Sequence, residues 1–264
     1  MSASESGFVT NRRGEDLFVH LIHGNSGRLW IFCPPLLEEA MFCRASYQEL
    51  ALSLHAQGDC IIQFDYAGTG DSSGSMQAIS LNSLVRDAAD LIAWTGHDVA
   101  VTTAFGLRLG ANVALRLAAQ HPGMRVLALL PLDDGAQYLD YLLRYNLVTQ
   151  LAAWSAVRET RGDLHTRLTH GQSVNVLGFT LPPGLATSLR DYRLAGEADT
   201  LPPGLLLLNK SAESKALVRH LARPGSEVRE VQVKPFWHEP KQLVGLQSLL
   251  SGLSLAHLSV EQCE

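Results

Sequence analysis

Residues 98–110 read Asp98-Val-Ala-Val-Thr-Thr-Ala-Phe-Gly106-Leu-Arg108-Leu-Gly110, and they indicate the architecture more sharply than any other segment. The apolar run before Gly106 predicts a buried strand, and helical spacing from Arg108 to about Gln120 predicts a helix that begins at once. A strand that turns directly into a helix between two glycines is typical of a nucleophile elbow, here with Arg108 in place of the serine. Glycine suits both sides of that tight turn, because the strand and the helix approach closely there.

Strands and helices alternate on both sides of this turn. Periodicity predicts strands over residues 17–23, 28–33, 60–65, 98–105, 126–132, 204–209 and 227–233, and helices over residues 41–57, 81–92, 108–120, 214–222 and 240–253. The first two strands are joined by a tight turn at residues 24–27 and predict an antiparallel start. The later alternation predicts an α/β fold with a mostly parallel sheet and helices on both faces.

The alternation lapses over residues 137–200. A helical stretch over residues 138–154, with Tyr138, Tyr141 and Tyr145 on one face, precedes polar sequence and the segment 174–183. We interpret residues 137–200 as a cap inserted over the strand ends. The sequence has no internal repeat and no low-complexity linker, so residues 1–264 are predicted to form a single domain.

Composition narrows the class of protein. The chain has 264 residues, 46% of them hydrophobic, with 21 Lys and Arg against 26 Asp and Glu and a formal charge of -5. It has no basic run, so no nucleic acid partner is predicted. The sequence shows no secretory leader and no transmembrane segment, and its four cysteines lack paired spacing, which predicts reduced thiols and a cytoplasmic location. No ligand spacing indicates a metal, and no cofactor is predicted.

Five motifs follow one another in order along the chain. They are Cys33-Pro34-Pro35-Leu-Leu-Glu38-Glu39, the glycine-rich loop of residues 65–72, Gly106-Leu-Arg108-Leu-Gly110, residues 171–178, and Pro235-Phe-Trp237. Together they resemble the α/β-hydrolase superfamily and, within it, the exosortase A system-associated hydrolase 2 group, over nearly the whole chain. That group carries a proline pair, two glutamates and an elbow arginine. The resemblance implies the α/β-hydrolase fold and genes placed near those for exopolysaccharide and protein sorting.

Arginine at position 108 changes the chemistry that this fold can perform. A guanidinium stays protonated and has no lone pair, so Arg108 cannot replace a serine nucleophile. A cation at a helix N-terminus costs roughly 0.3 to 1 kcal/mol, so a fixed anionic partner is expected. The resemblance implies that the loop of residues 34–39 lies beside the elbow. The expected partner is therefore Glu38 or Glu39, the Asp133-Asp134 pair after the next strand, or an anionic ligand.

His238 follows the last predicted strand, where the resemblance places a catalytic base. Asp134 is the predicted orienting acid, with Asp133, Asn209 and Glu213 as alternatives. A histidine oriented by a carboxylate can activate water without a covalent step. The predicted catalytic residues are thus Arg108, His238 and Asp134. The predicted substrate-binding residues are Pro35, Glu38, Glu39, Leu107 and Tyr138.

Two functions of different classes follow. In the first, the protein hydrolyses an ester, amide or glycan-linked acyl group, with Arg108 anchoring or polarising the substrate and His238 activating water. In the second, it is a catalytically inactive binding or accessory protein whose pocket recognises an exopolysaccharide precursor or a partner of the export machinery. A fold alone does not decide between them.

Overall fold

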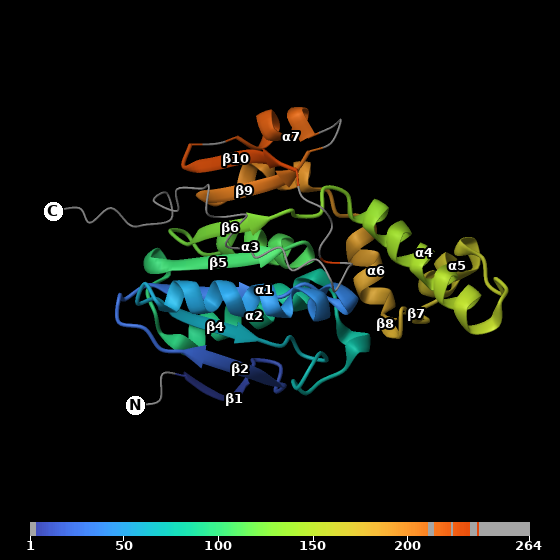
Figure 1. Ribbon diagram of the computed structural model, residues 1–264, viewed down its shortest axis with the longest axis horizontal. Helices are drawn as coiled ribbons and strands as arrows, with labels where there is room; N and C mark the ends of the chain where they lie inside the picture. The colour runs from blue at the N-terminus through green and yellow to red at the C-terminus, as the bar shows by residue number, and fades with distance from the viewer. Residues whose placement is uncertain (1–3, 211–213, 223, 233–236, 238–264) are drawn as a thin grey trace.

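The computed structural model describes residues 4–210, 214–222, 224–232 and 237. An eight-stranded sheet in the order β1-β2-β4-β3-β5-β6-β9-β10 forms its centre (Figure 1). The strands are β1 Ser4–Thr10, β2 Asp16–Ile22, β3 Leu29–Cys33, β4 Cys60–Phe64, β5 Thr102–Leu107, β6 Arg125–Leu129, β9 Gly204–Asn209 and β10 Ser226–Val231. The body helices are α1 Leu37–His55, η1 Met76–Ala78, α2 Leu81–Thr95, η2 Val99–Val101, α3 Leu109–Ala119 and α7 Ser214–Leu221.

The sheet is mostly parallel, as predicted. From β4 to β10 each neighbouring pair runs parallel, whereas β1 pairs with β2 and β2 pairs with β4 in antiparallel fashion. The two strands expected to form an antiparallel start are not paired with each other, because β4 lies between β2 and β3. The turn that joins them instead packs against the chain before β4, where the amides of Asn25 and Ser26 donate to the Gly58 carbonyl.

Successive residues of each strand point to opposite faces of the sheet and pack into two separate hydrophobic layers. Trp30 and Phe32 of β3 pack with Tyr47 and Leu54 of α1 on one face. Ile31 belongs to the layer that α2 and α3 form on the other face. Helices therefore cover both faces of the sheet, as the alternation of elements predicted.

The chain between β6 and β9 forms a separate group of elements beyond one end of the sheet (Figure 1). It comprises α4 Gly135–Trp154, α5 Arg161–Thr169, β7 Val174–Val176, β8 Phe179–Leu181, α6 Pro183–Arg190 and η3 Leu194–Thr200. Its two ends meet at an antiparallel bridge between Asp134 and Arg193. We call this group the cap. The predicted helix over residues 240–253 lies outside the described residues, and the single-domain organisation stays a prediction.

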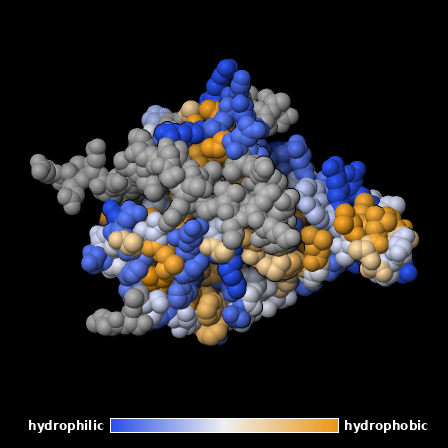
Figure 2. Space-filling view, in the orientation of Figure 1, coloured by the Kyte–Doolittle hydropathy of each residue, from blue (hydrophilic) through white to orange (hydrophobic). Residues whose placement is uncertain are grey.

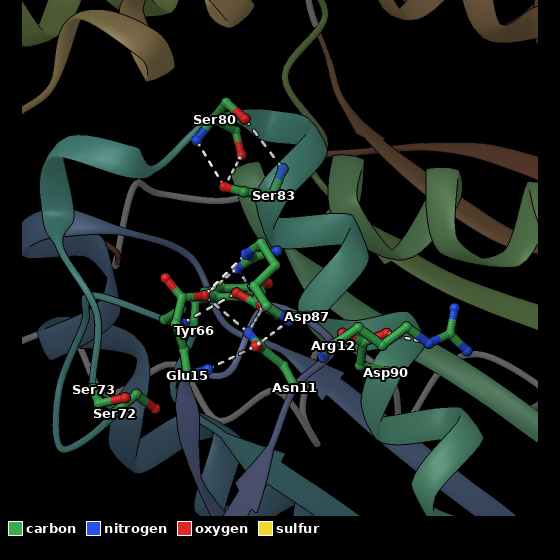
Figure 3. Close-up of polar contacts among 12 residues, drawn as sticks. Asn11, Arg12, Glu15, Tyr66, Ser72, Ser73, Ser80, Ser83, Asp87 and Asp90 are labelled. Carbon is green, nitrogen blue, oxygen red and sulfur yellow. Dashed lines mark hydrogen bonds and ion pairs between the residues drawn. The ribbon is translucent and has the colours of Figure 1, made fainter.

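A buried carboxylate ties the N-terminal hairpin to the loop after β4 (Figure 3). Asp87 of α2 accepts hydrogen bonds from Asn11 Nδ2 at 2.9 Å, Arg13 Nη2 at 2.8 Å and the Ala67 amide at 3.1 Å. Ser80 and Ser83 close a capping box at the start of the same helix. These contacts fix the start of the glycine-rich loop at Ala67.

Two further expectations concern membrane-spanning segments and the state of the cysteines. Within the described ranges, no helix is both long enough and apolar enough to cross a bilayer. Cys33, Cys43 and Cys60 are buried and unpaired, and burial raises the pKa of the Cys33 and Cys43 thiols. The fourth cysteine, Cys263, lies outside the described residues.

Candidate active site

Arg108 lies on the bend between β5 and α3. Its backbone adopts φ 55° and ψ -128°, a conformation that residues with a Cβ rarely take. The flanking glycines permit the close approach around it: a Cβ on Gly106 would lie 2.1 Å from the Gly110 carbonyl oxygen, and one on Gly110 would lie 2.2 Å from that of Cys33. The backbone therefore has the form of a nucleophile elbow, with a cation where the nucleophile is expected.

Four groups surround the guanidinium of Arg108. Its Nε lies 3.3 Å from Glu39 Oε1, and its Nη1 lies 3.5 Å from the Leu130 carbonyl oxygen. Its Cζ lies 4.8 Å from the ring centroid of Trp237 and 5.6 Å from that of Tyr138, within range of cation–π attraction. The side chain remains 18% exposed, and it lines the cleft described below.

Glu39 is the anionic partner that the helix N-terminus led us to expect. It stands in the first turn of α1, together with Glu38, because this helix begins at Leu37 and not at the predicted residue 41. The predicted boundary was therefore wrong. Acidic side chains favour the positive end of a helix, which is one reason for the earlier start. Leu37 itself has φ 58°, so strained backbone precedes both glutamates.

Burial and neighbouring charge shape the ionisation of this cluster. Burial raises the pKa of Glu39, against the opposing pull of Arg108. Burial is the largest single influence and works to lower the pKa of Arg108, but the charge and hydrogen bond of Glu39, together with Tyr138 and Tyr141, leave that pKa above its ordinary value. Burial, reinforced by the charge of Glu39, raises the pKa of Glu38 to about 7. Neither carboxylate oxygen of Glu38 accepts a hydrogen bond from another described residue.

A polar cleft of about 580 Å³ opens beside Arg108. The loop after β6 and the first turns of α4 form one wall, and the end of β9 contributes Asn209. Its other polar lining residues include Asp133, Asp134, Gln137, Tyr138, Asp140, Tyr141 and Arg144. Asn112 of α3 fixes this wall, because its side chain exchanges hydrogen bonds with both the amide and the carbonyl of Leu132.

The remaining predicted site residues fall in different places. Asp134 lies on the cleft wall, where its carboxylate accepts a hydrogen bond from the Gln137 amide and pairs with Arg193 at 3.1 Å. Leu107 is fully buried in β5, and its amide donates to the Tyr47 hydroxyl. Pro35 lines a separate groove between α1 and the strands β2 and β4. His238 lies outside the described residues.

The structure adds Trp237 and Asp140 to the site, and it places Tyr141 of the cap-helix tyrosines in the cleft. Trp237 stacks on Arg108, although the sequence offered it only as part of a motif. Tyr141 reaches the cleft, and its hydroxyl donates to that of Tyr145 at 2.7 Å. Asp140 also lines the cleft and pairs with His165 of α5 at 2.9 Å. The tyrosine spacing on the cap helix was the available signal for Tyr141; nothing comparable marked Asp140.

Comparison with known proteins identifies the fold. No protein-family model matches the sequence, and no curated protein matches it significantly. Among solved structures, the α/β hydrolase GrgF from Penicillium sp. sh18 superposes with a TM-score of 0.65 at 16% identity, over 97% of each chain. A proline iminopeptidase-related protein from Thermus thermophilus gives 0.63 at 16% identity, over 97% of this chain and 98% of its own.

A third structure, the thioesterase domain from the curacin biosynthetic pathway, gives a TM-score of 0.57 at 14% identity, over 95% of this chain and 100% of its own. At these identities the likeness concerns the fold alone. The chain has the α/β-hydrolase fold, as the sequence resemblance implied.

Proposed function

We propose that this protein is a hydrolase that cleaves an ester, amide or glycan-linked acyl group with activated water instead of a covalent acyl-enzyme. The observation that carries the proposal is the backbone of Arg108, which keeps the strained form of a nucleophile elbow beside a polar cleft. Such strain costs about 1–3 kcal/mol, and strained residues cluster at active sites and ligand clamps. Arginine has no atom that can attack a substrate. The elbow therefore contributes to the proposed reaction by holding a positive charge in a fixed position.

In this proposal Arg108 stabilises the charge that develops on the substrate. Water attacks the carbonyl carbon as a base takes its proton, and the resulting oxyanion lies against the guanidinium of Arg108. The tetrahedral species then collapses, and the leaving group receives the proton from the base. His238 is the proposed base and Asp134 its proposed orienting acid. The stacking of Trp237, which precedes His238, on Arg108 supports this assignment.

The lining of the cleft supports a hydrophilic substrate. Pockets for small molecules are mostly apolar with a few polar groups, whereas this cleft presents carboxylates, amides, phenols and two guanidinium groups. An acylated sugar suits this lining better than a long acyl chain. We further propose that the protein acts in the cytoplasm, in an exopolysaccharide or exosortase system. Such genes beside this one would support that assignment, and their consistent absence would remove it.

The experiment compares p-nitrophenyl esters, acyl thioesters and acetylated sugars as substrates for the full-length protein. We expect turnover without a burst of product, and its loss in His238→Ala and in Arg108→Met. A fluorophosphonate probe should leave the protein unlabelled, because no activated serine occupies the elbow. A pre-steady-state burst or stable labelling would overturn the water mechanism.

A second function is favoured by one specific observation. The cation of Arg108 is already paired with Glu39 and faces two aromatic rings, an arrangement that also serves non-covalent recognition of a ligand. A binding protein would show no turnover of any substrate, yet an acetylated sugar from the same panel would raise its melting temperature. That result would replace the first proposal with the second.

A further inference from the structure

The outer end of the cap carries an exposed apolar stripe. Val148, Leu151 and Trp154 follow one another at intervals of three along α4, and Val157 lies just beyond its end. Their exposed fractions run from 46% to 55%. Figure 2 shows hydrophobic surface gathered on this projecting end of the molecule. We call these four residues the cap-tip stripe.

The surroundings of the cap-tip stripe are basic, although the chain as a whole is acidic. Residues 140–170 contain Arg144, Arg158, Arg161 and Arg167 against Asp140, Glu159 and Asp163, in a chain of formal charge -5. Arg161 pairs with Asp140, and Arg167 pairs with Glu159. Arg144 and Arg158 form no ion pair with any described residue, so two cations beside the stripe are left without a neutralising carboxylate.

Trp154 and Arg158 form a unit of their own. The Arg158 Cζ lies 4.7 Å from the ring centroid of Trp154, so an aromatic ring and a cation share one position on the surface. Tryptophan favours the interface between lipid and water, and arginine can bury its stem beside apolar groups while its charge reaches phosphate. Apolar residues on one side of a helix end, flanked by cations, are characteristic of segments that lie in a membrane surface.

We propose that the cap-tip stripe attaches the protein reversibly to an anionic lipid surface. Val148, Leu151 and Trp154 enter the headgroup region, while Arg158 contacts a lipid phosphate. The charge of this region favours an anionic lipid surface over symmetric pairing with a second copy of the chain, because such pairing would place two basic cap tips face to face. Because α4 also lines the cleft through Tyr138 and Tyr141, attachment holds the cleft close to the lipid surface. This inference does not depend on which reaction, if any, occurs in the cleft.

The test is co-sedimentation of the full-length protein with vesicles. We expect binding to equimolar phosphatidylglycerol and phosphatidylcholine, weaker binding at raised salt, and little binding to phosphatidylcholine alone. Trp154→Asp and Leu151→Asp should each weaken binding by about tenfold or more, and Arg158→Gln by about fivefold.

The body of the protein offers matched controls. Trp94 of α2 is 49% exposed and Leu52 of α1 is 54% exposed, so Trp94→Asp and Leu52→Asp make the same chemical changes away from the cap. Both should bind vesicles like the unaltered protein. Thermal melting of all variants identifies any that fail to fold. If Leu151→Asp fails to fold, Leu151→Ser is the milder substitution at the same position.

Three outcomes would overturn the proposal. These are absence of vesicle binding by the unaltered protein, equal losses in the cap-tip and control variants, and binding that is indifferent to phosphatidylglycerol. Light scattering on the same samples tests whether a second copy of the chain, and not a lipid surface, covers the cap-tip stripe. A dimer that Trp154→Asp dissociates, without vesicle binding, would assign the cap-tip stripe to a second copy of the chain.

Discussion

Arg108 and Glu39 form an ion pair in which neither charge can be removed alone without cost. Glu39 is fully buried, and its nearest described cation is Arg108 at 3.3 Å. Arg108→Met would leave the carboxylate without that cation, and removing one partner of a buried pair costs about 3–5 kcal/mol. We expect a loss of that size in the free energy of unfolding, measured by urea denaturation.

The double variant Arg108→Met with Glu39→Gln removes both charges and keeps side chains of similar volume, so no buried charge is left without its partner. Most of the lost stability should therefore return. If the double variant is as unstable as Arg108→Met alone, the arginine contributes through packing on Trp237 and not through its charge.

Glu38 should make stability depend on pH near neutrality. Its pKa is about 7 in the folded protein, above the ordinary 4.5, so the folded state retains a proton that the unfolded chain releases. Its stabilising contribution is fully present below pH 4.5 and is lost as pH rises through about 7. The shift corresponds to at most about 3 kcal/mol.

The comparison with Glu38→Gln isolates this effect. Glutamine cannot ionise, so the variant should lack this loss and become more stable than the unaltered protein above neutrality. Urea denaturation of both proteins across this pH range measures the difference. Parallel pH profiles for the two proteins would show that Glu38 ionises as an ordinary carboxyl group.

At this scale the sequence identified the charged residues of the site but not their geometry. The absence of a lone pair on arginine is a property of the residue, so the loss of the serine mechanism could be predicted directly. That Glu39 and not Glu38 would face Arg108 depends on where α1 begins. The stacking of Trp237 joins positions far apart in the chain, and periodicity carries no information about such contacts.

At the scale of elements, the tight turn from β5 into α3 requires glycine at positions 106 and 110. Gly106→Ala would place a Cβ 2.1 Å from a backbone carbonyl oxygen, and Gly110→Ala would place one 2.2 Å from another. Backbone atoms cannot yield as a flexible side chain does. We therefore expect each change to cost more than about 3 kcal/mol of unfolding free energy, measured by urea denaturation.

Gly162 offers a matched control for the elbow glycines. It lies in the first turn of α5, and the nearest atom to a Cβ there is the Thr160 Oγ1 at 3.7 Å. Gly162→Ala should stabilise the protein by up to about 1 kcal/mol, because alanine loses less backbone entropy in a helix. An elbow variant as stable as this control would show that β5 and α3 can separate.

The elements themselves were largely predictable from periodicity, and the exceptions have physical causes. The strand β1 has an exposed, polar sequence at the sheet edge, so it lacks the apolar alternation that reveals a strand. The strand expected from residue 98 begins at Thr102, because Asp98 caps a short 3₁₀ turn first. In both places local hydrogen bonding and edge pairing decide the structure, and hydrophobicity has little influence.

The whole molecule combines a predictable fold class with a less predictable strand order. Alternation of elements fixes a parallel α/β sheet, because each crossover helix must return the chain to the same sheet end. Alternation does not say which strand lies next to which. The pairing of β4 with both β2 and β3 brings together segments distant in sequence, so the position of the N-terminal hairpin followed only from the structure.

The cap and the sheet should respond separately to a change at their junction. Gly135 begins α4 where α6 ends, and a Cβ on it would lie 2.1 Å from the Leu189 carbonyl oxygen. Gly135→Ala must push these helices apart, and the three atoms nearest to the added Cβ all belong to Leu189 of α6. We expect hydrogen exchange to accelerate in α4 and α6 while the sheet amides stay protected. Gly196→Ala, at a cap position with open space around it, is the control and should leave exchange unchanged. Faster exchange throughout the molecule in Gly135→Ala would instead mean that cap and sheet unfold as one cooperative unit.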